Sequence, residues 1–242
     1  MTELLHGDCY EILPTLGKCD CVITDPPYEF NAHVTGRGMF ADSNAERYGR
    51  KRHVGNLERL EEVGSTTFSP GKFLDLLEPR MERFCGYFFC NKTLVADYIE
   101  WARKRKYTYD ILVMLKRNPV PAHSTHHVSD TEYIILIRGK GCWFQGQGLE
   151  LDDYRKWYMT TCGKRVHPAE KPVELLERFV RTSVRPGGTV LDPFMGSGST
   201  AIAALKNGRN FVGIEKADEY FSLAKERVDG FNCIGGLFEG IA

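Results

Sequence analysis

A carboxylate, two prolines and an aromatic ring follow one another along the chain as Asp25, Pro26, Pro27 and Tyr28. They come directly after an apolar run, residues 21–24, which predicts a buried strand. The carboxylate can accept a hydrogen bond from an amino group, and the prolines, which lack an N–H, can hold a backbone carbonyl outward as a second acceptor. The ring offers a face on which a flat base can stack. Together these residue types indicate chemistry on the exocyclic amine of a nucleobase, although Asp and Pro also form ordinary turns.

A glycine-rich stretch joins a predicted strand to a predicted helix, and it reads Asp192-Pro193-Phe194-Met195-Gly196-Ser197-Gly198-Ser199-Thr200. Glycines let the backbone turn sharply and approach a ligand closely. The stretch lacks the Gly-Lys-Ser/Thr of a phosphate-binding loop and does not match G-x-G-x-x-G. The next predicted strand ends on Glu215, an acid placed to bind the hydroxyls of a ribose. This half of the chain therefore predicts a nucleoside site without phosphates; the alternative is a tight strand–helix turn.

Strands and helices are expected to alternate along the chain, which indicates an α/β fold with ligands at the carboxyl ends of its strands. Apolar runs predict strands over residues 3–8, 19–25, 86–90, 111–116, 132–138, 189–192 and 210–215. Helical spacing predicts helices over residues 9–16, 73–84, 94–104, 172–184, 199–207 and 218–228. We expect the strands over 111–116 and 132–138 to form an antiparallel pair with a long loop.

The composition limits the classes of protein to which the chain can belong. A chain of 242 residues with 42% hydrophobic and 26% charged residues suits one globular domain over residues 1–242. Lysine plus arginine equals aspartate plus glutamate at 32 each, so any contact with nucleic acid must come from local patches. The apolar runs are too short to span a bilayer, and no N-terminal signal pattern is present. Eight cysteines without a C-x-x-C pair indicate reduced thiols in a cytoplasmic protein and no metal site.

Three segments show little periodicity. Residues 29–66 carry a basic group that includes Arg50, Lys51 and Arg52, and they are either a solvated face or a phosphate-binding insertion beside Tyr28. The loop over 117–130 holds three histidines, which favour contact with nucleic acid over a metal. Residues 140–166 are either a small recognition segment or a connection.

The motifs and their order resemble the amino-directed (N6-adenine/N4-cytosine) DNA methyltransferases of the β arrangement, in which D-P-P-Y precedes F-x-G-x-G. The resemblance covers most of the chain and rests on Gly7-Asp8, Asp25 to Tyr28, His167-Pro168-x-x-Lys171-Pro172, Asp192 to Thr200 and Glu215. It implies a Rossmann-like, S-adenosylmethionine-dependent methyltransferase fold with a circularly permuted motif order. The sheet is then mostly parallel, with seven strands of which one is antiparallel. The 189–192 strand should lie beside 19–25, and the N-terminal strand beyond 210–215.

The resemblance also implies the roles of individual residues. Asp25 and the Pro26 carbonyl would accept the two hydrogens of the target amine, and the flipped base would stack on Tyr28; the catalytic set is Asp25, Pro26, Pro27 and Tyr28. Asp8 would face the adenine of the cofactor and Glu215 its ribose. The full cofactor set is Asp8, Asp25, Lys171, Asp192, Phe194, Gly196, Ser197, Gly198, Ser199 and Glu215.

The implied activity is site-specific transfer of a methyl group from S-adenosylmethionine to adenine N6 in double-stranded DNA, as in restriction-modification systems. By the same resemblance, Asp at position 25 favours adenine over cytosine. Methylation of cytosine N4 or of RNA is an alternative on the same fold, and a non-catalytic, methyltransferase-like DNA-binding subunit is an alternative of another class. The short recognition region suggests a brief or relaxed target sequence, or recognition shared across a homodimer.

Overall fold

The computed structural model describes residues 1–27, 68–117, 119, 127–128, 130–145, 147–161 and 170–238, without the side chains of 232–238. Tyr28, the 29–66 segment with its basic group, most of the 117–130 loop, and His167-Pro168 therefore lie outside the described residues. By its contacts the chain divides into two units, residues 1–26 with 70–242 and residues 27–69. The first unit is described below.

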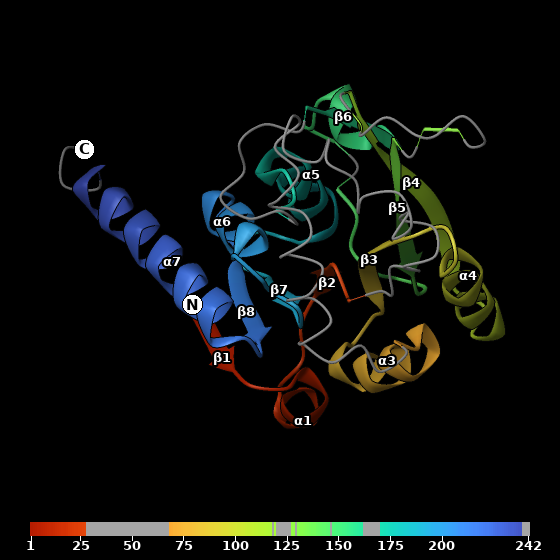
Figure 1. Ribbon diagram of the computed structural model, residues 1–242, viewed down its shortest axis with the longest axis horizontal. Helices are drawn as coiled ribbons and strands as arrows, with labels where there is room; N and C mark the ends of the chain where they lie inside the picture. Colours follow the sequence, from red (N-terminus) through yellow and green to blue (C-terminus); the bar gives the residue numbers. More distant parts are fainter. Residues whose placement is uncertain are drawn as a thin grey trace, which may run out of the picture. The chain divides into compact units, whose positions relative to one another are not determined.

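A sheet carries the first unit, with the strand order β1-β8-β7-β2-β3-β5-β4-β6 in the described part of the chain (Figure 1). The strands are β1 (Thr2–His6), β2 (Cys21–Thr24), β3 (Cys85–Cys90), β4 (Thr108–Lys116), β5 (Thr131–Arg138), β6 (Trp157–Thr160), β7 (Thr189–Asp192) and β8 (Asn210–Glu215). Only β5 runs antiparallel to its neighbours in this sheet, β3 and β4, and the other described pairs are parallel. The mostly parallel sheet with one antiparallel strand is thus confirmed, as is the pairing of 111–116 with 132–138.

The predicted count of seven strands is wrong, because eight strands are present among the described residues. The additional strand is β6, which lies inside the 140–166 segment and pairs with β4 at the edge of the sheet. It has four residues, and Trp157 and Met159 are 45% and 44% exposed. A strand this short and this exposed leaves no run of apolar residues that marks a buried strand.

The predicted neighbours in the centre of the sheet are confirmed. β2 pairs in parallel with β7 through Cys21–Val190 and Val22–Leu191. β1 lies beyond β8, with His6 opposite Glu215. Because parallel strands end at the same edge, the residues that follow β1, β2, β7 and β8 are brought to one side of the sheet.

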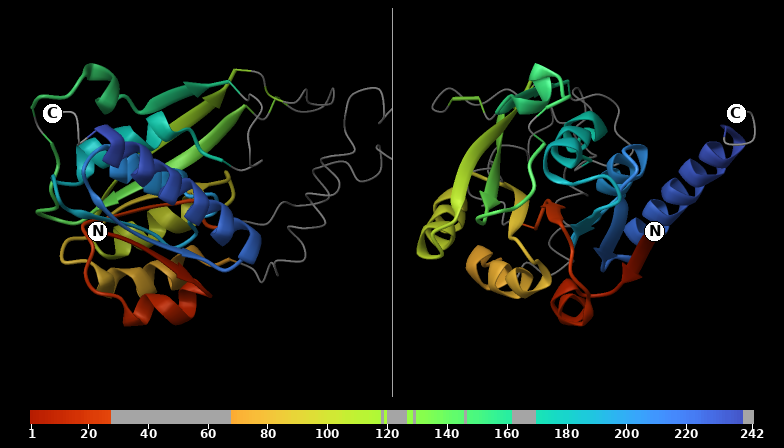
Figure 2. Two further views of the ribbon diagram at one scale, coloured as in Figure 1. Left: turned by 90° about the vertical axis from the view of Figure 1, so that its left-hand side faces the viewer. Right: turned by 180° about the vertical axis from the view of Figure 1, so that it is seen from behind.

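Helices cover both faces of the sheet (Figure 2). Their bounds are α1 (Cys9–Ile12), α3 (Pro70–Leu77), α4 (Val95–Lys104), α5 (Val173–Ser183), α6 (Ser199–Lys206) and α7 (Asp218–Phe238), with 3-10 turns η1 (Leu13–Thr15), η3 (Glu78–Arg80) and η4 (Leu151–Tyr154). α1, α3 and α4 lie on one face, and α5, α6 and α7 on the other. The helix predicted over 73–84 ends at Leu77, because Pro79 cannot donate the next helical hydrogen bond.

Neighbouring residues of β3 show how the two faces are packed. The ring of Tyr87 stacks on Phe179 of α5 at 4.1 Å between centroids, and the ring of Phe88 stacks on Tyr98 of α4 at 5.3 Å. Successive side chains of a strand point to opposite faces, so this strand is buried on both sides. Burial on both sides explains the unbroken apolar runs of the central strands. No described helix is long and apolar enough to cross a membrane.

Candidate active site

Asp25 is the first residue after β2, and its two carboxylate oxygens have different surroundings. Oδ2 lies 2.6 Å from Nζ of Lys171. Oδ1 is buried and has no hydrogen-bond partner among the described residues, although the side chain as a whole is 22% exposed. Burial raises the pKa of this carboxyl, and the Lys171 ammonium opposes that rise. An unpaired buried acceptor costs about 1–3 kcal/mol, so Oδ1 is suited to a donor that a ligand brings.

Asp192, at the end of β7, ties the neighbouring strand to this point. Its Oδ1 accepts hydrogen bonds from the Thr24 hydroxyl at 2.7 Å and from the Phe194 amide at 3.2 Å. The side chain is 3% exposed, and burial raises its pKa to about 6 although hydrogen bonds from Thr200 and Thr24 lower it. The carboxylate therefore fixes the end of β2 against the end of β7.

The two glycines of the turn between β7 and α6 are favoured at their positions for different structural reasons. Gly196 has φ of 52° and Gly198 has φ of 79°, both in the left-handed region that favours glycine. A Cβ added to Gly198 would lie 3.2 Å from the Cβ of Ala224 in α7, so this glycine permits close helix packing. Among the residues that the structure describes, a Cβ added to Gly196 would meet nothing within 4 Å. The space in front of Gly196 is therefore open to a ligand.

Glu215, at the end of β8, lies against this turn. Its Oε2 accepts the Gly196 amide at 2.9 Å, and its Oε1 accepts the Ala217 amide at 2.8 Å. A carboxylate oxygen can accept more than one hydrogen bond, so Glu215 keeps capacity for a hydroxyl. The structure thus brings Glu215 and Gly196 together, as a nucleoside seat requires.

Asp8 caps the first helix beside Glu215. Its Oδ1 accepts the Tyr10 amide at 2.9 Å, and its Oδ2 lies 3.0 Å from Nζ of Lys216. Burial alone would raise the pKa of Asp8, but the Tyr10 amide and Lys216 together lower it. The Gly7 amide donates to the Glu215 carbonyl at 3.0 Å, so the ends of β1 and β8 are joined.

Arg227 of α7 contacts both serines of the turn, Ser197 and Ser199. Its Nη1 lies 3.3 Å from both the Ser197 carbonyl and the Ser199 hydroxyl, and its Nη2 lies 2.6 Å from Oε1 of Glu170. Ser197 and Ser199 are both 6% exposed. Phe194 faces the other side of the sheet edge, where its ring lies 5.3 Å from that of Phe73.

Sequence reasoning missed several residues that build this edge: Thr24, Glu132, Glu170, Lys216 and Arg227. Each acts through a partner that is distant in the sequence, so no local spacing marks it. Glu132 had one usable signal. It begins one strand of the predicted antiparallel pair, and the start of a strand that opposes its parallel neighbours lies at the edge where those neighbours end.

The chemistry of the donors and acceptors fits a nucleoside cofactor without phosphates. The edge offers the free Oδ1 of Asp25, the open face of Gly196 and the carboxylate of Glu215. Among the described residues, no group of three or more His, Cys, Asp or Glu could hold a metal ion. The arrangement can thus orient an amine beside a bound nucleoside.

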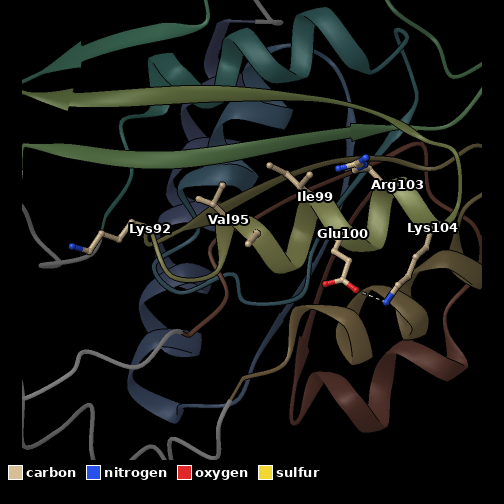
Figure 3. A pocket seen from close by; sticks show the side chains of 7 residues that line it. Lys92, Val95, Ile99, Glu100, Arg103 and Lys104 are labelled. Atoms are coloured by element: carbon tan, nitrogen blue, oxygen red, sulfur yellow. Dashed lines mark ion pairs between the residues drawn. The ribbon is translucent and has the colours of Figure 1, made fainter.

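A surface recess along α4 does not share this chemistry (Figure 3). It is lined by Lys92 and by side chains of α4, and Glu100 and Lys104 form an ion pair of 2.6 Å along this helix. Both charged side chains are more than half exposed. The recess is a solvated helix face and contains none of the strand-end residues.

Comparison with known proteins shows which proteins the chain resembles. A family model described as DNA methylase, for N6 and N4 methyltransferases, matches residues 19–226. The type II methyltransferase M2.DpnII of Streptococcus pneumoniae is 44% identical over 250 aligned positions, which cover 95% of this chain and 90% of that protein.

Solved structures of related proteins show the same fold. The crystal structure of the M1.HpyAVI–SAM complex matches with a TM-score of 0.70 and 26% identity, and covers 94% of this chain and 100% of that one. The cytosine-N4-specific PvuII DNA methyltransferase matches with a TM-score of 0.65 over 93% of this chain and 85% of that one. At 14% identity, the second similarity shows the fold alone.

Proposed function

Because the chain belongs to the DNA methylase family of N6 and N4 methyltransferases, we propose that it transfers a methyl group from S-adenosylmethionine to the N6 amine of adenine in double-stranded DNA. One observation carries the proposal: the unpaired Oδ1 of Asp25 lies at the end of β2, and the glycine-rich turn follows the adjacent strand β7. Aspartate at this position favours adenine by resemblance within the family. The SAM complex of the related M1.HpyAVI supports the cofactor.

The proposed reaction depends on orientation. S-adenosylmethionine supplies a methyl group on a sulfonium, and the thioether is a good leaving group. The target amine is a weak nucleophile, because its lone pair is delocalised into the base. Asp25 Oδ1 and the Pro26 carbonyl would accept hydrogen bonds from its two N–H groups and turn the lone pair toward the methyl group. The new N–C bond would form as the C–S bond breaks, the thioether would leave, and the methylated amine would lose one proton through Asp25 to solvent. Such placement carries much of the rate, and effective molarities for well-oriented groups reach about 10⁵–10⁸ M.

The cofactor seat follows from the strand ends. We assign binding of the ribose hydroxyls to Glu215. At Gly196, whose amide donates to Glu215, we propose that the backbone comes close to the cofactor. Asp8 lies at the neighbouring strand end, where it would face the cofactor's adenine. The proposed seat also includes Lys171, Asp192, Phe194, Ser197, Gly198 and Ser199. The buried residues of this set shape the turn and do not touch the ligand.

The DNA partner must present the base out of its stack, since the amine is inaccessible inside a duplex. We assign stacking of the flipped base to Tyr28. We also propose that residues 1–242 form a single catalytic domain with an insertion over 29–66, which the separate unit 27–69 supports. The 140–166 segment contributes β6 to the sheet, so its recognition role would fall to its remaining residues.

The product nucleoside tests the proposal. The protein is incubated with methyl-labelled S-adenosylmethionine and duplex DNA of mixed sequence, and the DNA is digested to nucleosides and separated. We expect label in N6-methyldeoxyadenosine. Label in N4-methyldeoxycytidine would contradict the adenine assignment. No transfer in a folded, cofactor-binding preparation would favour a non-catalytic subunit.

A further inference from the structure

Asp25 is the first of four side chains of alternating charge that contact one another in series. Lys171 Nζ lies 2.6 Å from Asp25 Oδ2 and 3.1 Å from Glu132 Oε2. Glu132 Oε1 lies 2.6 Å from Lys116 Nζ. They come from the end of β2, the residues before α5, the start of β5 and the end of β4. The Lys171 side chain is 10% exposed, and its ammonium also lies 4.9 Å from the centre of the Phe89 ring.

We propose that Lys171 and Glu132 are positioning residues for Asp25, which hold its carboxylate by Oδ2 so that Oδ1 alone remains free for the target amine. This inference rests on the proposed function and adds to it two residues outside the catalytic motif. An ammonium on a flexible stem does not fix a carboxylate by itself. Here the ammonium is held by a second carboxylate and by an aromatic face, so its position and that of Oδ2 are determined together.

The same arrangement controls the charge of Asp25. Burial raises the pKa of Asp25, Lys171 lowers it, and the negative charge of Glu132 raises it. The pKa of Glu132 is held at about 2, because Lys171 and Lys116 overcome the effect of burial. Other ionisable groups near Asp25 are Asp192 of β7, Cys90 of β3 and Tyr98 of α4. Loss of Lys171 would leave the charges of Asp25 and Glu132 without the ammonium between them, so the pKa of Asp25 would rise and its carboxyl would stay protonated to higher pH. A protonated carboxyl has lost its negative charge and carries a hydroxyl on one oxygen, so it is a weaker acceptor for the N–H of the amine.

A purely structural role gives a different expectation. In that case the four side chains only fasten β4 and β5 to the start of α5. Substitutions would lower the free energy of unfolding, but the pH dependence of the reaction and the titration of Asp25 would not change.

The test compares Lys171→Met, Glu132→Gln and the double variant with the parent protein. Single-turnover methyl transfer is measured against pH at saturating cofactor. We expect the acid limb of K171M to move up by about one pH unit or more, since an opposite charge at this distance shifts a carboxyl by about 1–3 units. E132Q should move the limb down and slow transfer several-fold. The acid limb of the double variant should lie between those of K171M and the parent. Unchanged acid limbs in folded variants would overturn the inference.

A second readout does not depend on activity. The protein is labelled with ¹³C in the aspartate carboxyl groups, the Asp25 signal is assigned with Asp25→Asn, and its titration is followed by NMR. The midpoint should rise in K171M and fall in E132Q, and equal midpoints would again overturn the inference. Lys104→Met is the matched control, because it removes an exposed lysine–glutamate pair on α4 and should leave both readouts unchanged. A parent without transfer but with these shifted midpoints would refute the proposed function and leave the control of Asp25 standing.

Discussion

The acid at the end of β7 shows how burial and hydrogen bonding compete at a single residue. Asp192 accepts from Thr24 and from the Phe194 amide, yet burial raises its pKa from 3.8 to about 6. The folded protein therefore holds this proton more tightly than the unfolded chain does. Stability contributed by the protonated form is present below the unfolded pKa and is lost as pH rises toward 6.

Asp192→Asn tests this balance. The free energy of unfolding of the parent should fall relative to D192N between about pH 4 and pH 6, by up to about 3 kcal/mol for a shift of about two units. Asparagine keeps the acceptor oxygen but cannot ionise, so D192N should be the more stable protein at pH 7. Urea unfolding of both proteins across this pH range gives the difference directly. A difference that does not vary with pH would contradict the assigned shift.

The two glycines of the turn give a paired prediction. Gly198→Ala should lower the free energy of unfolding by about 2 kcal/mol, because it adds backbone strain and a close contact with Ala224. Gly196→Ala should cost only about 1 kcal/mol, the cost of the left-handed backbone alone. If the space at Gly196 belongs to the cofactor, G196A should also lose at least about tenfold in cofactor affinity, or 1.4 kcal/mol. Calorimetric titration with S-adenosylmethionine decides this, and full affinity in G196A would place the cofactor elsewhere.

The residue types of the site could be predicted from the sequence, but their partners could not. Asp25 was found by its motif and by the strand before it. Its pairing with Lys171 and Glu132 depends on where α5 and β5 begin relative to β2, which local spacing does not encode. Likewise, no local pattern in the sequence indicated that Gly198, besides its predicted place at the ligand, permits α7 to approach the turn.

Among the helices and strands, the sequence predicted best those elements that are strongly buried. The central strands are covered by helices on both faces, so their apolar runs were unambiguous. The edge strand β6 was missed because it is short and exposed. The last helix was expected to end at residue 228. It continues instead to Phe238, at an intrinsic cost for Gly230 of about 1 kcal/mol.

Arg227 links α7 to the glycine-rich turn between β7 and α6 and to Glu170, so it gives a prediction about elements. Arg227→Met should lower the free energy of unfolding by about 1–3 kcal/mol, the range for hydrogen bonds to charged groups. It should also weaken cofactor binding several-fold, because Ser197 and Ser199 lose their common donor.

Arg227→Lys keeps the charge beside Glu170 but not the fork that reaches both serines, so it should restore stability better than affinity. The exposed Lys225→Met on the same helix is the control. Thermal unfolding and cofactor titration are measured together, and equal recovery of both in R227K would argue against a role in shaping the turn.

For the whole molecule, the net charge of zero means that DNA affinity must come from local basic groups. Arg50, Lys51 and Arg52 lie outside the described residues, and their role remains a prediction from the sequence. Replacing all three with glutamine should reduce the slope of log affinity against log salt by up to about 0.9 per lost phosphate contact. DNA binding measured at several salt concentrations gives the slope, and an unchanged slope would indicate a solvated face.

The central claim is that Asp25 orients the target amine, and Asp25→Asn tests it most directly. On one preparation of the variant and one of the parent, single-turnover methyl transfer to duplex DNA and the Kd for S-adenosylmethionine are measured. We predict that transfer falls by at least about 100-fold, the loss that a misplacement of about 1 Å can cause, while the Kd changes by less than about threefold. Transfer at the parent rate in a folded D25N protein would contradict the account.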